Sequence, residues 1–187
     1  MSSFVGDLKG VVTGNADAMK RVAKTPSHLP MAVLIVALTS VAKFFQGWHM
    51  SKQAEELFGF ALLDTTFLVK QAVVAFLTVF IMAFFIQFAS TKWFKGAKVD
   101  LKGFMSLYGF MMLPMVLVAV PFSLAQLVAL IWVLVLFFKM MKAIFGFGFG
   151  KALLAAIVGG FLGLIIVGII GAVLGVNEGS FSFETSF

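Results

Sequence analysis

Cysteine is absent from the chain, which also has only two histidines, one tyrosine and eight acidic residues among its 187 residues. The lack of cysteine excludes disulfides, thiolate metal sites and thiol nucleophiles. His28 and His49 fall at opposite membrane interfaces, so a histidine metal centre or catalytic pair is not expected. No Asp or Glu lies deep in an apolar run, which disfavours ion-coupled transport. The sequence therefore predicts no enzyme, no catalytic residue, no metal and no cofactor.

Charged residues are also scarce, at 12% of the chain, whereas soluble domains carry roughly 25%. Hydrophobic residues make up 61%, with 24 Phe and 18 Gly. This composition suits a bilayer rather than a single soluble core. The formal charge of +6 lies mainly in loops, which favours anionic lipid headgroups as partners and gives no sign of nucleic-acid binding.

The basic residues that are present fall into three clusters separated by long apolar runs. Cytoplasmic loops of membrane proteins keep an excess of Lys and Arg. We therefore expect a multi-pass protein of the cell membrane, with a cytoplasmic N-terminus, an exterior C-terminus and Lys43, Lys52 and Lys70 outside. The three cytoplasmic clusters are Lys9, Lys20, Arg21 and Lys24; Lys92, Lys95, Lys98 and Lys102; and Lys139, Lys142 and Lys151.

The apolar runs predict an all-α fold: a polytopic membrane helical bundle with five transmembrane helices and an N-terminal amphipathic interfacial helix. The 36 uncharged residues from Gly103 to Phe138 are too many for one span, so we divide them at Pro121. The predicted organisation is a cytoplasmic segment (1–27), a membrane domain (28–176) and an exterior tail (177–187). The predicted spans are 29–48, 67–90, 103–120, 123–141 and 153–175.

Residues 3–24 have the pattern of one or two short amphipathic helices. Phe4, Leu8 and Val11 share one helical stripe, Gly14 interrupts it, and Asn15 is suited to cap a second helix. Basic residues opposite such a stripe fit a helix on the membrane surface. Docking of the same stripe onto the bundle is an equally good interpretation.

Polar residues inside the spans are costly in hydrocarbon and call for a partner or a function. Gln87, Tyr108 and Gln126 are candidates for an intramembrane polar lining that a solute or lipid follows. The alternative is interhelical hydrogen bonding, worth about 1 kcal/mol each. Pro114 removes a backbone hydrogen bond and is expected to kink its span, either to shape a cavity beside Tyr108 or simply to fit helices together.

Glycine spacing in the last span predicts close helix packing. Gly159 with Gly163, and Gly171 with Gly175, form G-x-x-x-G pairs that let two helices approach. The contact can lie within the chain or between protomers.

The order of these features resembles the Yip family of Ypt/Rab-interacting multi-span membrane proteins, in its short prokaryotic-type form. The likeness lies in the helix 15–24 leading into Pro26 and Pro30, in Leu107-Tyr108-Gly109 followed by Leu113-Pro114, in Trp132, and in the basic, glycine-containing connection to the last span. The Asp-Leu-Tyr-Gly-Pro motif of eukaryotic members, which are associated with Rab GTPases and vesicle traffic, is absent. The resemblance implies a non-enzymatic membrane protein that binds other membrane proteins.

These observations lead to a scaffold or adaptor as the favoured function. Its partners would be anionic lipid headgroups and either another membrane protein or a second copy of the chain. The alternative is a facilitative channel, permease or lipid transporter with a polar path between helices. For the scaffold, the candidate contacts are Lys92, Lys95, Lys98 and Lys102.

Overall fold

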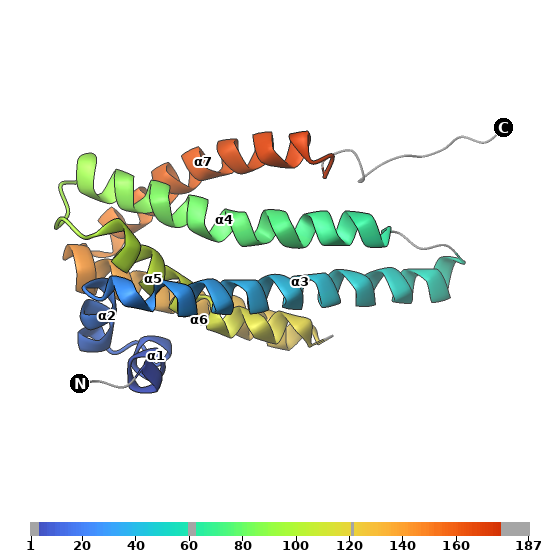
Figure 1. Ribbon diagram of the computed structural model, residues 1–187, viewed down its shortest axis with the longest axis horizontal. Coiled ribbons are helices and arrows are strands. Elements are labelled where there is room, and N and C mark those ends of the chain that lie inside the picture. The colour runs from blue at the N-terminus through green and yellow to red at the C-terminus, as the bar shows by residue number, and fades with distance from the viewer. Residues whose placement is uncertain (1–3, 60–62, 121, 177–187) are drawn as a thin grey trace.

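A computed structural model describes residues 4–59, 63–120 and 122–176 (Figure 1). Five helical stretches in these residues are long and apolar enough to cross a membrane, which confirms the prediction of an all-α multi-span bundle. The predicted turn at Pro121 and the predicted tail 177–187 lie outside the described residues. The structure forms α1 (Phe4–Val12), α2 (Ala16–Ala23), η1 (Pro26–His28), α3 (Leu29–Phe58), α4 (Thr65–Lys92), α5 (Leu101–Met111), η2 (Leu113–Ala119), α6 (Ser123–Phe145) and α7 (Phe149–Val173).

The long helices pack side by side with their axes roughly along one direction (Figure 1). α4 packs against α7 on one side and α3 on the other, while α5 and η2 pack on α3 and η2 also contacts α6. The short helices α1 and α2 lie against α5 and α6 at one end of the bundle. The end of α4, the start of α5, the end of α6 and the start of α7 lie at that same end, which we name the basic end.

The first long helix extends beyond the predicted span 29–48. α3 does not stop at Trp48 but continues to Phe58, where Gly59 in the left-handed conformation (φ 78°) ends it. The Ser51 hydroxyl accepts a hydrogen bond from the Leu63 N–H (3.1 Å) and lies 3.2 Å from the Leu63 carbonyl, which ties the last turns of α3 to the chain before α4. α3 therefore projects past α6 and α7 at the end opposite the basic end (Figure 1).

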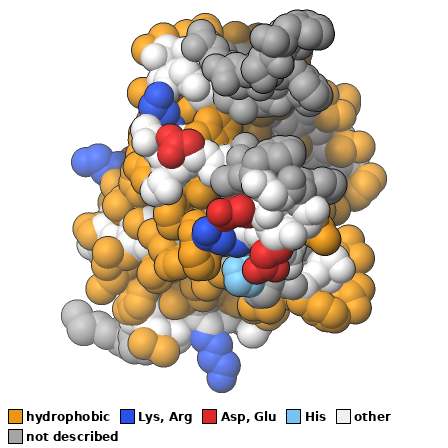
Figure 2. Space-filling model, turned by 90° about the vertical axis from the view of Figure 1, so that its right-hand side faces the viewer, with side chains coloured by type: hydrophobic (Ala, Val, Ile, Leu, Met, Phe, Trp, Pro, Cys, Tyr) orange, Lys and Arg blue, Asp and Glu red, His pale blue; other side chains and the backbone are white. Residues whose placement is uncertain are grey.

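That opposite end carries charge of both signs. Figure 2 shows acidic and basic side chains together with a histidine on this end, surrounded by hydrophobic side chains. Lys52 pairs with Glu55 at 2.7 Å on the exposed part of α3. The two ends of the bundle therefore differ in charge.

Pro114 interrupts the third span, as its lack of an N–H group leads one to expect. The α-helical part, α5, is capped by the Asp100 carboxylate, which accepts a hydrogen bond from the Gly103 N–H at 3.0 Å, and it ends at Met111. The chain then continues as the 3-10 helix η2, with Pro114 in its first turn. The span is therefore bipartite rather than a single α-helix.

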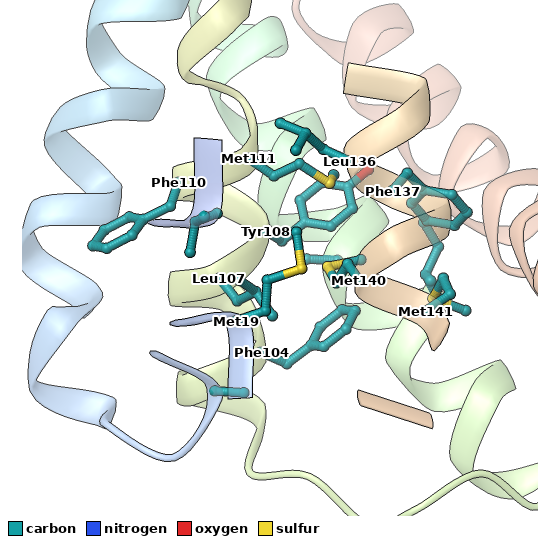
Figure 3. Packing of buried hydrophobic residues seen from close by; sticks show 14 of the residues in the cluster. Met19, Phe104, Leu107, Tyr108, Phe110, Met111, Leu136, Phe137, Met140 and Met141 are labelled. Carbon is teal, nitrogen blue, oxygen red and sulfur yellow. The ribbon is translucent and has the colours of Figure 1, made fainter. Parts of the chain in front are cut away.

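A core of aromatic, aliphatic and methionine side chains fills the space between α2, α5 and α6 (Figure 3). Phe104, Leu107 and Phe110 of α5 are fully buried there, with Met19 from α2 and Met140 from α6. Many other apolar side chains of the long helices are exposed, as expected where lipid is the solvent. Examples are Leu34, Leu38, Val73, Leu130, Leu134, Ile157 and Phe161.

Candidate functional site

The N-terminal segment docks on the bundle, which decides between the two interpretations of its amphipathic stripe. It forms two helices joined at Gly14, whose φ of 79° suits glycine. Asn15 caps α2 as expected, because its Oδ1 accepts hydrogen bonds from the Asp17 and Ala18 N–H groups (2.9 and 3.0 Å). Val11 of α1 and Met19 of α2 are fully buried. The apolar stripe is thus part of the protein core.

A buried carboxylate holds α1 in place. Asp7 is only 2% exposed, and its Oδ1 accepts a hydrogen bond from Arg21 Nε at 3.0 Å and lies 2.9 Å from Arg21 Nη2. His28 Nε2 lies 3.4 Å from Asp7 Oδ2. Burial of a charge requires such partners. Asp7 was not predicted as a functional residue, although its spacing from Phe4 and Val11 puts it in the apolar stripe, and an acid in such a stripe signals a buried ion pair.

Aromatic and indole contacts complete this attachment. The rings of His28, Phe4 and Phe110 contact one another, with the Phe4 and Phe110 centroids 6.0 and 5.8 Å from that of His28. Trp132 of α6 donates its Nε1–H to the carbonyl of Val12 at 2.9 Å. This bond satisfies a carbonyl at the end of α1 that has no partner within the helix. Trp132 thereby connects α1 to a membrane span.

Glycine allows α2 and α5 to approach closely. A Cβ atom at Gly103 would clash with the carbonyl oxygen of Ala23, and one at Gly109 would lie 2.8 Å from the Cβ of Ala32 in α3. Gly103 also supplies the N–H group that Asp100 caps. The start of α5 therefore meets the end of α2.

Two neighbouring cavities open at this junction. The first, of about 400 Å³, is lined by Lys20 of α2, by Lys24 directly after that helix, by Lys98 and Asp100, and by apolar atoms of Ala143 and other residues. The second, of about 360 Å³, is lined by Gly14, Lys20, Lys139, Lys142 and Ala143, among others. Lys20 and Ala143 belong to both cavities. The arrangement brings together lysines from all three basic clusters.

The predicted loop lysines lie in two kinds of position. Lys98 lines the first cavity, whereas Lys92, Lys95 and Lys102 are exposed and line neither cavity. Lys95 adopts a φ of 53°, a left-handed conformation that is uncommon for a residue with a Cβ. The loop thus divides into one cavity lysine and three outward lysines.

The three predicted lining residues lie apart. Gln87 donates its amide N–H to the carbonyl of Val99 at 2.7 Å, so it holds the chain between α4 and α5. Tyr108 is buried in the core beside Phe104. Gln126 borders a cavity of about 350 Å³ at the opposite end of the bundle, with Gln46, His49 and Gln53 of α3. The structure does not bring the three residues to one path.

The two glycine pairs of the last span have different surroundings. Gly159 and Gly163 of α7 face α4: a Cβ on Gly159 would lie 2.7 Å from the Ile86 Cα, and one on Gly163 would lie 2.5 Å from the Met82 sulfur. Gly171 is buried, and Gly175 follows α7 with φ 67°. Near the start of α7, the Lys151 ammonium lies 5.1 Å from the centre of the Phe147 ring.

No group of three or more metal-ligating side chains occurs in the described part of the chain. The geometry offers instead a basic end built from docked helices, lysines and two cavities. Such an arrangement can bind anions.

Comparison with known proteins agrees with the resemblance seen in the sequence. The family model described as the Yip1 domain matches residues 9–172. No curated protein and no solved structure matches the chain. The match begins within α1 and therefore includes the docked helix α2 as well as the membrane spans.

Proposed function

The chain belongs to the Yip1 domain family, and from that premise we propose that it is a non-enzymatic adaptor of the cell membrane that gathers partner proteins and anionic lipids at its basic end. The observation that carries the proposal is the convergence of three basic clusters, distant in sequence, at one end of the bundle (Figure 1). A concentrated positive field attracts acidic surfaces and speeds their association.

Orientation follows from the same convergence. Cytoplasmic segments keep Lys and Arg, so the basic end faces the cytoplasm and the projecting end of α3 lies outside. The N-terminus is then cytoplasmic and the C-terminus exterior. The partner meets a surface made of α2, the chain between α4 and α5, and the end of α6. The partner in this proposal is a membrane protein with an acidic cytoplasmic surface.

The outward lysines supply the protein contact in this proposal. Lys92, Lys95 and Lys102 are exposed and line neither basic-end cavity, so their ammonium groups are available to a partner. Lys98 adds its charge from the edge of the first cavity. Because exposed charges are screened over about 8 Å at physiological salt, the contact should weaken as salt rises.

Substitution of Lys92, Lys95, Lys98 and Lys102 by Gln tests the proposal. The protein is extracted from its native membrane in polymer-bounded lipid discs, and proteins that co-purify are quantified by mass spectrometry. We expect the amount of stoichiometric partner that co-purifies to fall about tenfold or more, since each surface charge near an oppositely charged patch contributes up to about 1 kcal/mol to binding. The control variant replaces Lys43, Lys52 and Lys70, outside the basic end, by Gln. It should leave the amount of co-purified partner unchanged. Equal recovery of the partner from both variants would overturn the adaptor.

The transport alternative has weaker support. A polar path requires its lining residues to follow one another across the membrane, and Gln87, Tyr108 and Gln126 occupy separate environments. Gln126 and its neighbours form a local polar cavity at one end. Solute flux in proteoliposomes that falls when Gln126 becomes Leu would favour transport over the adaptor.

A further inference from the structure

The two cavities of the basic end gather five lysines around a shared wall. Lys20 and Ala143 line both, Lys24 and Lys98 complete the cationic lining of the first, and Lys139 and Lys142 that of the second. These side chains come from α2, from the chain between α4 and α5, and from α6. No short sequence motif contains them, so only the fold assembles this site.

Their charge is not compensated within the described residues. None of the five lysines forms an ion pair there, and Asp100 is the one acid that lines either cavity. The Asp100 carboxylate caps α5 through the Gly103 N–H at 3.0 Å, where the helix N-terminus already stabilises a negative charge. An anion entering the cavities therefore meets lysines without competing partners.

The second cavity is bordered by a close contact between α6 and the turn before α2. A Cβ at Gly14 would lie 2.7 Å from both Cδ and Nζ of Lys139, so the Lys139 side chain crosses directly over this glycine. Gly14 is left-handed, with φ 79°. The turn thus leaves room for the Lys139 side chain at the edge of the cavity, which limits the positions that its ammonium group can take.

The wall of the first cavity includes apolar side chains, and α6 also carries exposed apolar side chains elsewhere. Ala23, Val99 and Ile144 line the first cavity beside the lysines. Farther along α6, Leu130 and Leu134 are exposed, as expected for residues that face acyl chains. Basic pockets between spans at the cytoplasmic side suit phosphate headgroups of lipids. A ligand whose charged end enters from the bilayer fits this surface better than a water-borne anion.

We propose that the paired cavities bind the headgroup of a membrane lipid that carries two phosphates, one phosphate in each cavity, with Lys20 between them. A diphosphatidyl glycerolipid has this chemistry. The inference rests on the proposed function, because it places the basic end in the headgroup layer of the membrane. In this proposal Lys20, Lys139 and Lys142 bind the lipid, and the outward lysines (Lys92, Lys95 and Lys102) contact the protein partner.

Native mass spectrometry of the whole purified protein tests the site. The protein is mixed with a diphosphatidyl lipid or with a single-phosphate phosphatidyl lipid of the same acyl chains. We expect the two-phosphate lipid to be retained preferentially, and the triple substitution K20Q/K139Q/K142Q to weaken its binding on the order of a hundredfold, since each lysine near an anionic headgroup contributes about a factor of five. The triple variant K20R/K139R/K142R keeps the charges and should retain the lipid, which separates charge loss from misfolding.

Matched charge loss elsewhere makes the result specific. K92Q/K95Q/K102Q removes three lysines of the same end without touching either cavity and should leave lipid binding unchanged while weakening the protein partner. Unchanged partner binding in this variant, together with intact lipid binding, would overturn the adaptor proposal and leave the lipid site standing. Equal retention of the one-phosphate and two-phosphate lipids, or unchanged binding in K20Q/K139Q/K142Q, would overturn the paired site. Displacement of the lipid by inorganic diphosphate at equal concentration would assign the site to a water-borne anion and overturn the lipid proposal.

Discussion

At the scale of single residues, Asp7 explains why α1 stays on the bundle. A carboxylate that is 2% exposed loses its hydration, and neighbouring groups must compensate for that desolvation cost. Here the neighbours are the Arg21 guanidinium at 2.9 Å and His28 at 3.4 Å. Arg21 remains half exposed, so its own desolvation is small. The pair therefore fixes the position of α1 at modest cost, and it does so at a place where apolar contacts alone would allow sliding.

Replacement of Asp7 by Ala is expected to loosen α1. Loss of a hydrogen bond to a charged group costs about 2 kcal/mol, which raises the population of the open segment about thirtyfold. Hydrogen exchange followed by mass spectrometry should show faster exchange in α1 while α4 and α7 stay unchanged. Asp17→Ala is the control, because Asp17 is exposed and its removal should cost only a few tenths of a kcal/mol. Identical exchange of α1 in both variants would show that the ion pair does not hold the helix.

At the scale of elements, α4 and α7 pack through glycine rather than through interlocking large side chains. Gly159 brings the backbone of α7 against the backbone of Ile86, and Gly163 receives the Met82 side chain. Hydrocarbon tails are as apolar as leucine, so close van der Waals contact is what distinguishes helix from lipid as a neighbour. The position of α7 therefore depends on the absence of a methyl group at Gly159.

Gly159→Ala is expected to separate the two helices. The Cβ would lie 2.7 Å from the Ile86 Cα, and backbone atoms cannot rotate away. We expect a loss of about 1–3 kcal/mol and a melting temperature lower by about 5 °C in detergent. Gly168→Ala in the same helix is the matched control: a Cβ there would meet no atom of the described residues within 4 Å, and Ala is the better helix former by up to about 1 kcal/mol. A melting temperature that falls equally in both would mean that helix packing at Gly159 is not the cause.

The bipartite third span has a length that fits the bilayer. An α-helix rises about 1.5 Å per residue and a 3-10 helix about 2.0 Å. α5 and η2 together then extend about 30 Å, the thickness of the hydrocarbon core, whereas the same residues in α form would be about 3–4 Å shorter. Long 3-10 segments are uncommon because their hydrogen bonds are poorer. Pro114 removes one donor and so favours the longer form at this place.

Several elements could be predicted from the sequence because each depends on a local pattern. The five apolar runs predict the spans, and the Asn15 cap fixes the start of α2. The continuation of α3 past Trp48 could not be predicted in this way, since the polar residues after it are compatible with either a loop or an exposed helix. The docking of α1 was also open, because an amphipathic stripe has the same pattern against a membrane and against a protein core. The two cavities depend on contacts between distant segments, which no spacing reveals.

At the scale of the whole molecule, the two ends have different charge and different shape. The basic end is broadened by α1 and α2, while at the opposite end α3 projects beyond α6 and α7 (Figure 1). Cationic side chains are retained on the cytoplasmic side during insertion, and on that ground the proposed orientation has the broad end facing the cytoplasm. Both proposals for this protein depend on that assignment, since a partner or an inner-leaflet lipid reaches the basic end only from that side.

The absence of cysteine allows a direct test of the orientation. Single thiols introduced by Ser27→Cys, at the basic end, and Gln53→Cys, on the projecting part of α3, lie at exposed positions and are each the sole thiol of the chain. A maleimide that cannot cross membranes is added to intact cells and to permeabilised cells. Thiols facing the medium react in intact cells, so we expect Gln53→Cys to react in both samples and Ser27→Cys to react only after permeabilisation. Labelling of Ser27→Cys alone in intact cells would invert the orientation and remove the basis for a cytoplasmic adaptor. Protection of both thiols until the cells are opened would place the protein in an internal membrane.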